Sequence, residues 1–185
     1  MKEKIKNCIF DSAGLERTLA RLAHEIVEQN RGSEGLALVG IRARGAPLAE
    51  RLARKISSIE GGRNIPVGIL DITLYRDDYL RSNKTPKVRA TEIPFEINDR
   101  TLVLVDDVLY TGRTVRAAID ALLDHGRPAR IQLAILVDRG HREMPIQGDF
   151  VGQKVVTLPG EEVRVRLMEI DGCDEAVLVE ASKKE

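Results

Sequence analysis

The sequence has no tryptophan, and only three tyrosines and three phenylalanines supply aromatic side chains among its 185 residues. Its two cysteines, Cys8 and Cys173, are far apart and match no spacing typical of a zinc or redox site. They indicate inert thiols in a reducing compartment. No apolar run is long enough for a signal peptide or a membrane span, so we expect a cytoplasmic protein with no membrane partner.

An excess of charge of either sign is also lacking, because 29 basic side chains balance 29 acidic ones. A nucleic-acid partner is compatible with this balance only if the basic residues form a local patch. Little long-range repulsion opposes self-association. We therefore expect a homo-oligomer, a dimer or a tetramer.

Aliphatic residues are abundant, and their pattern alternates between short buried runs and helical periodicity. The predicted helices cover 12–30, 47–58 and 115–125; the predicted strands cover 36–41, 67–75, 102–105, 131–137, 162–170 and 176–179. Alternating strands and helices predict an α/β fold with a central, mostly parallel sheet flanked by helices on both faces. The length favours a single domain, 1–185.

The most informative stretch is 102–114, with the sequence LVLVDDVLYTGRT. A buried strand delivers Asp106 and Asp107 to its carboxyl end, where ligands bind in open α/β sheets. The following Thr-Gly-Arg-Thr opens a helix, and its amides and hydroxyls can hold a phosphate. Carboxylates suit ribose hydroxyls, so the pattern predicts a ribose-5-phosphate site. Read separately, the same features are a strand-end turn and a helix cap. Walker and Rossmann glycine motifs are absent.

Residues 105–114 resemble the 5-phosphoribosyl-1-pyrophosphate (PRPP) motif of type I phosphoribosyltransferases. Three further segments are similar to the bacterial bifunctional pyrimidine operon attenuator and uracil phosphoribosyltransferase family: 21–25 (RLAHE), 71–78 (DITLYRDD) and 136–143 (LVDRGHRE). The similarity extends from about residue 10 to about residue 180. It implies a type I phosphoribosyltransferase fold, with a small hood formed by N-terminal residues and about 139–185.

The resemblance also implies the reaction: uracil and PRPP give UMP and pyrophosphate. Mg²⁺ is expected to enter bound to PRPP, with no metal ligand from the protein. The implied catalytic residues are Asp106, Asp107 and Arg44. The implied substrate-binding residues are Ala43, Arg44, Asp106, Asp107, Val108, Leu109, Tyr110, Thr111, Gly112, Arg113, Thr114, Arg139 and Val163.

Two basic segments are candidates for the pyrophosphate. Arg42 and Arg44 follow the first core strand, and Ala43–Arg44 match the family's contact positions, although the family often has Thr at position 43. The polar loop 76–89 can close over the polyphosphate and exclude water. Its cations are Arg76, Arg81, Lys84, Lys87 and Arg89. The alternative for both segments is a solvated surface without a role in binding.

Residues after the strand 131–137 are expected to contact the base, with Arg139 and Val163 as the implied contacts. His141 is a candidate general base, but a structural or surface histidine is the more ordinary interpretation. The segment 155–160 departs from the family's usual sequence. A purine-type transferase therefore stays open as an alternative.

The family also binds a leader RNA and senses uridine nucleotides, UMP and UTP. Candidate RNA contacts are Arg17, Arg21, His24 and Arg31 on the first helix, together with Arg142 and Lys154. Gln29, Gln147 and Gln153 stand where the family usually has Arg or Lys, which weakens the case for RNA. A solvated helix face is the alternative. A third possibility is an RNA-binding attenuator with vestigial catalysis.

Overall fold

The computed structural model describes residues 4–76 and 90–180. The helices are α1 (Ser12–Asn30), α2 (Gly45–Ile59), the 3-10 turn η1 (Thr73–Tyr75), α3 (Arg113–Leu123) and α4 (Met168–Asp171). The strands are β1 (Ile5–Phe10), β2 (Leu36–Ile41), β3 (Val67–Leu70), β4 (Thr101–Leu109), β5 (Arg130–Asp138), β6 (Phe150–Lys154), β7 (Glu161–Arg166) and β8 (Glu175–Glu180). In this part of the chain, no helix is long and apolar enough to cross a membrane.

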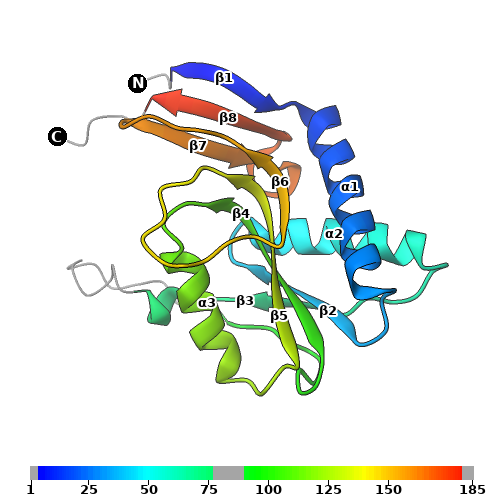
Figure 1. Ribbon diagram of the computed structural model, residues 1–185. Coiled ribbons are helices and arrows are strands. Elements are labelled where there is room, and N and C mark those ends of the chain that lie inside the picture. Colours follow the sequence, from blue (N-terminus) through cyan, green and yellow to red (C-terminus); the bar gives the residue numbers. More distant parts are fainter. Residues whose placement is uncertain (1–3, 77–89, 181–185) are drawn as a thin grey trace.

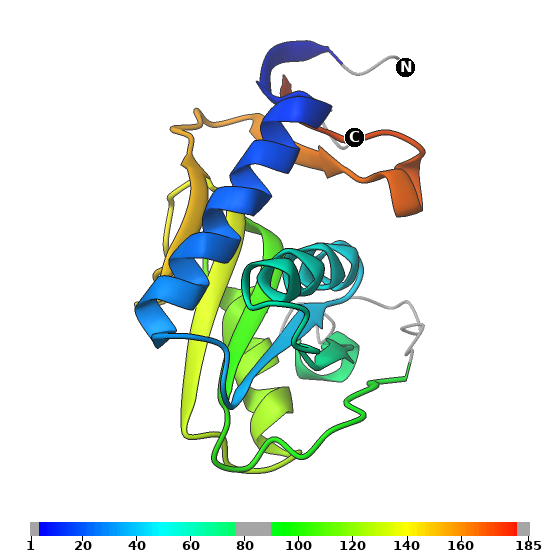
Figure 2. The same cartoon turned by 90° about the vertical axis from the view of Figure 1, so that its right-hand side faces the viewer.

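The core is a five-stranded parallel sheet in the order β3-β2-β4-β5-β6. Every residue of β2 is buried, as expected for a strand that is covered on both faces. One hydrophobic cluster joins the sheet to α1 and α2, and a second joins its other face to α3. Figure 2 shows α1 and α2 on the same side of the sheet, with α3 behind it. The predicted α/β architecture with helices on both faces is therefore confirmed.

A second, antiparallel sheet in the order β1-β8-β7 joins the two ends of the chain. We call β1, β7, α4 and β8 the hood. Figure 1 shows it as a separate layer above the core, and α1 runs from it to the core sheet. Val165 and Leu167 of the hood lie in the same hydrophobic cluster as α1 and α2, which fixes the hood on that side.

Two predicted strands are wrong in part. The strand expected at 67–75 ends at Leu70, because Asp71 Oδ1 accepts a hydrogen bond from Thr73 N (2.8 Å) and starts a turn. The strand expected at 162–170 ends at Arg166. There Asp171 Oδ2 accepts from Leu167 N (2.9 Å), and the chain turns into α4. Local side-chain bonds to the backbone compete with strand pairing at both places.

The sequence analysis missed β1 and β6, two short edge strands with few buried residues. It also ended the central strand too early. β4 continues to Leu109, so Asp106 and Asp107 lie within the strand, and Asp106 pairs in register with Ile135 of β5. The long strand carries both carboxylates on a rigid element.

Candidate functional site

The order of the core strands reverses beside β2, since the chain first adds β3 on one side of it and then β4 on the other. A crevice is expected at such a switch point, outside the carboxyl ends of the strands. Two segments meet there: residues 42–44 between β2 and α2, and residues 109–112, which run from the last residue of β4 to the start of α3. We call the second one the phosphate loop.

Asp106 and Asp107 lie at the carboxyl end of β4, and Asp106 is only 7% exposed. Their carboxylates accept main-chain hydrogen bonds: Asp106 Oδ1 from Asp107 N (2.9 Å) and Asp107 Oδ1 from Val108 N (2.8 Å). Burial raises the pKa of Asp106 well above its ordinary value, and the adjacent Asp107 raises it further. Burial also raises the pKa of Asp107, against the opposing effect of Arg44. The pair therefore offers buried carboxylate oxygens that can accept hydrogen bonds from the hydroxyl groups of a ligand.

The phosphate loop turns sharply into α3. Gly112 has a φ of 92°, which favours glycine, and a Cβ there would lie 3.0 Å from Met144 Cβ. The N-cap residue Gly112 makes no side-chain cap, and Arg113 N donates a long hydrogen bond to Thr111 Oγ1 (3.4 Å). The first turn of α3 can therefore still present amides to an anion. A cavity of about 290 Å³ opens at this point, lined by Arg76 and residues 108–115. The geometry suits a phosphate group.

The segment after β5 braces the phosphate loop through its main-chain oxygens. Arg139 N donates to Leu109 O (3.0 Å), and Arg142 Nη1 donates to Tyr110 O (2.8 Å). Thr111 O accepts from both Glu143 N (2.9 Å) and Met144 N (3.0 Å). The phosphate loop is therefore held in one conformation by residues about 30 positions further along the chain.

The β2–α2 loop approaches β4 closely. A Cβ on Gly45 would lie 2.3 Å from Val105 O, so only glycine permits this contact. Arg42 turns away from the crevice. Its Nη2 donates to Ala90 O (3.1 Å) and pairs with Glu92 (3.3 Å). Arg44 is near enough to Asp107 to oppose the rise of its pKa. Of the two predicted cations, only Arg44 faces the carboxylate pair. Ala43 between them is exposed.

Asp171 of α4 reaches the β2–α2 loop, a contact that the sequence analysis missed. Arg44 donates to it through Nε (3.3 Å) and Nη2 (2.8 Å) across 127 positions of the chain. Nearby, Arg51 of α2 binds Glu169 and Asp174 with two bonds each, at 2.5 to 3.0 Å. The acidic residues in 169–174 predict a contact between the hood and α2 only if α2 is already known to lie beneath them.

The predicted base contacts lie on two elements. Arg139 follows β5 and reaches toward the hood, where its Nη2 donates to Glu161 O (2.7 Å). Val163 lies in the middle of β7, half-buried and in register with Leu178 of β8. His141 is exposed, and its Nε2 lies 2.9 Å from Thr157 O. The fold thus brings Arg139 and the start of β7 together.

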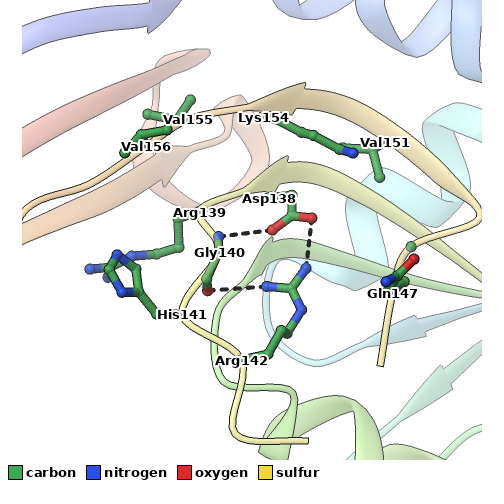
Figure 3. Close-up of a pocket in the computed structure, with 11 residues that line it drawn as sticks. Asp138, Arg139, Gly140, His141, Arg142, Gln147, Val151, Lys154, Val155 and Val156 are labelled. Atoms are coloured by element: carbon green, nitrogen blue, oxygen red, sulfur yellow. Dashed lines mark hydrogen bonds and ion pairs between the residues drawn. The ribbon is translucent and has the colours of Figure 1, made fainter. Parts of the chain in front are cut away.

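A larger cavity of about 490 Å³ lies between the loop after β5 and β6 (Figure 3). It shares no lining residue with the cavity at the phosphate loop. Arg142, Lys154 and Gln147, all considered above for RNA, line it. Arg142 also binds Asp138 Oδ2 (2.6 Å) and Gly140 O (3.1 Å), which favours a loop-bracing role for this arginine.

The helix residues proposed for RNA are all exposed on α1: Arg17, Arg21, His24 and Arg31. Arg21 Nη2 donates to Gly152 O (2.5 Å), so α1 and β6 lie side by side. Of the predicted loop cations, Arg76 lines the 290 Å³ cavity. Arg81, Lys84, Lys87 and Arg89 lie outside the described residues, and their role stays a prediction.

Comparison with known proteins gives consistent results. The model of the phosphoribosyl transferase domain family matches residues 7–169. The chain is 59% identical over 175 residues to the "Bifunctional protein PyrR" of Pelotomaculum thermopropionicum, which covers 95% of this chain and 96% of that protein. Identity to the protein of the same name from Thermus aquaticus is 57% over 177 residues, or 96% and 97% of the two chains.

Among solved structures, the chain is similar to a hypoxanthine phosphoribosyltransferase from Trypanosoma cruzi (TM-score 0.73, 15% identity, 95% of each chain). A hypoxanthine-guanine phosphoribosyltransferase from Bacillus anthracis gives a TM-score of 0.70 at 16% identity, over 95% of this chain and 99% of that one. These similarities confirm the predicted type I phosphoribosyltransferase fold. The chain belongs to the phosphoribosyl transferase domain family and, within it, to the family of the bifunctional PyrR proteins.

Proposed function

We propose that this protein is a uracil phosphoribosyltransferase, which converts uracil and PRPP to UMP and pyrophosphate. The observation that carries the proposal is the buried pair Asp106 and Asp107 at the switch point of the sheet. The pair adjoins the phosphate loop along the chain and Arg44 in space. This arrangement matches PRPP, in which a ribose links a 5′-phosphate to a pyrophosphate.

In the proposed reaction, the bond from ribose C1 to the pyrophosphate oxygen breaks and a bond from C1 to a ring nitrogen of uracil forms. That nitrogen loses its proton, which the leaving pyrophosphate or solvent accepts. Asp106 and Asp107 accept hydrogen bonds from the ribose hydroxyls and hold the sugar. The first amides of α3 bind the 5′-phosphate. Arg44 stabilises the negative charge that develops on the leaving pyrophosphate. Catalysis therefore depends on positioning and charge, and it requires no dedicated base.

The position of His141 supports a structural role. Because the main-chain oxygen of Thr157 can only accept, His141 Nε2 carries the proton in this contact. Nε2 is then unable to take a proton from uracil. The ring also packs edge-on against Tyr110, with 5.9 Å between the ring centroids. His141 thus ties the phosphate loop to the segment that contains Thr157.

Mg²⁺ fits this site as a companion of PRPP. Within residues 4–76 and 90–180, no group of three His, Cys, Asp or Glu side chains is arranged to hold a metal. The two carboxylates beside a phosphate site suit a cation that keeps its waters and substrate oxygens as ligands. When bound, Mg²⁺ would neutralise charge on the pyrophosphate.

Release of pyrophosphate from PRPP and Mg²⁺ tests the proposal, with uracil compared against hypoxanthine, guanine, adenine and orotate. We expect turnover with uracil and at least about 10²-fold less with the purines, since a site built to bond one base leaves its polar groups unpaired with another. Preferred turnover of a purine would replace uracil as the substrate and favour the purine-type alternative. No turnover with any base would favour the regulator with vestigial catalysis.

We further propose that the protein binds a pyrimidine-operon leader RNA and senses UMP or UTP. Two observations favour this second function. The name of the relatives describes them as bifunctional. In addition, Arg17, Arg21 and His24 are exposed on α1, and Arg21 contacts β6, which carries Lys154 at the edge of the 490 Å³ cavity. Clustered cations of this kind suit an RNA backbone.

A gel-shift assay with leader RNA, at two salt concentrations and with or without UMP, tests the RNA function. We expect UMP to strengthen binding and salt to weaken it. Arg17→Gln and Lys154→Gln should each reduce affinity about tenfold or less, because each removes one phosphate contact. Arg116→Gln on α3, on the opposite face of the sheet, is the control. Equal weakening by the control would indicate nonspecific binding and contradict the proposed surface.

A further inference from the structure

The guanidinium of Arg139 is held on three sides. Its Cζ lies 4.1 Å from the centroid of the Tyr110 ring, a cation–π contact. Nη2 donates to Glu161 O (2.7 Å), and Nε donates to Thr157 Oγ1 (3.3 Å). Across the described residues, Nη1 of Arg139 has no hydrogen-bond partner. Its two N–H groups are donors left for a ligand.

The three supports come from different parts of the chain. Tyr110 belongs to the phosphate loop, and its ring is contacted by Arg139 on its face and by His141 at its edge. Thr157 is 2% exposed and precedes β7, and Glu161 is the first residue of that strand. Tyr110 is 44% exposed, so burial alone does not explain why a tyrosine stands there. Its ring instead serves as a platform for Arg139.

We propose that Tyr110 and Thr157 are positioning residues that orient Arg139 toward the base; this inference rests on the proposed function. A free arginine side chain loses rotamer entropy when it is fixed. Fixing Arg139 before the base arrives removes that cost from binding. The oriented Nη1 can then donate to a carbonyl oxygen of uracil. Tyr110 thereby links the phosphate side of the site to its base side.

Four variants separate this role from a general effect on the fold. Tyr110→Leu removes the aromatic face, and Tyr110→Phe keeps it. Thr157→Val removes the hydroxyl at nearly constant volume, and Thr157→Ser restores it. Leu158→Ala is the control, because Leu158 is 62% exposed and follows Thr157 in the same segment. Each variant is assayed for KM of uracil, KM of PRPP, kcat and affinity for UMP by calorimetry.

Tyr110→Leu should raise KM for uracil about fivefold, the value of a cation–π contact at a partly exposed ring, while KM for PRPP changes less than about twofold. Thr157→Val should raise KM for uracil about threefold. Tyr110→Phe and Thr157→Ser should keep KM for uracil within about twofold of the wild-type value, and Leu158→Ala should match the wild type.

Three results would overturn the positioning role. These are equal effects of Tyr110→Leu and Tyr110→Phe, a parallel rise in both KM values, and no change in either KM. These results presuppose a wild type that uses uracil, so they leave the proposed function intact. A wild type that neither turns over uracil nor binds UMP would instead overturn the proposed function, and the orientation of Arg139 toward uracil would fall with it.

Discussion

Two groups of carboxylates border the crevice, and their surroundings differ. Glu169, Asp171 and Asp174 in the hood each bind an arginine of the α2 region. Hydrogen bonds from Arg51 lower the pKa of Glu169 and Asp174. By contrast, no arginine or lysine in the described residues forms an ion pair with Asp106 or Asp107, whose pKa values burial raises.

The two groups of carboxylates therefore differ in whether an arginine neutralises their charge. The paired carboxylates of Glu169 and Asp174 fasten the hood to α2. The carboxylates of β4 are buried without an ion pair to a cation of the described residues, which costs stability and suits them to bind a ligand. On this interpretation, the hood charges serve stability and the β4 charges serve binding. The following experiments test that division.

The largest effect is expected when both β4 charges are removed. The double variant Asp106→Asn, Asp107→Asn should lower kcat/KM for PRPP by about 10³-fold or more, because the acceptors for the ribose hydroxyls become weaker. Its melting temperature should equal or exceed that of the wild type, since two buried charges are lost. Pyrophosphate release and thermal denaturation measure the two quantities. Near-normal turnover would contradict the ribose assignment.

We call Arg51 the hood anchor, because it pairs with two carboxylates of the hood. Removing it should lower stability instead of preserving it. Arg51 is 11% exposed in its side chain, and Arg51→Met leaves Glu169 and Asp174 without their cation. We expect a loss of about 2 to 3 kcal/mol in the free energy of unfolding, measured with urea. Arg116→Met on α3 is the control, because its pair with Asp120 is exposed and should be worth about 0.5 kcal/mol or less. Equal losses in both variants would refute the anchor.

The pH dependence of stability gives a sharper comparison. Folding raises the pKa of Asp106, so its contribution to stability is present at low pH and is lost as pH rises from the unfolded to the folded pKa. Asp106→Asn has no such loss. Relative to the wild type, it should gain about 1.4 kcal/mol for each unit of the pKa rise as pH passes through that window. Urea unfolding between pH 4 and pH 8 measures it, and a constant difference would contradict the raised pKa.

The smallest effect is expected at His141. His141→Asn should reduce kcat less than about fivefold, because the ring braces the phosphate loop and is not required as a base. A general base would contribute about 10²- to 10⁴-fold. A steady-state assay with saturating uracil and PRPP decides between the two, and a loss of 10²-fold or more would make His141 the base.

The segments that form the proposed ribose-phosphate site could be predicted because they are continuous in the chain. Strand, carboxylate pair, loop and helix follow one another from residue 102, and short-range geometry arranges them. The base side was predicted only through the resemblance, and its supports Thr157 and Glu161 were missed. They meet Arg139 from 18 and 22 positions away, across two irregular segments and the short edge strand β6.

Periodicity along the chain was enough to predict the alternation of buried strands and amphipathic helices, and from it the parallel core. It also placed Asp106 and Asp107 near the carboxyl end of a central strand. These features depend on periodicity and on neighbours along the chain. Only the tertiary structure decided which arginine faces the crevice. Arg42 and Arg44 are two residues apart, but one binds Glu92 and the other binds Asp171. Such pairings depend on how distant segments pack, which local sequence patterns do not encode.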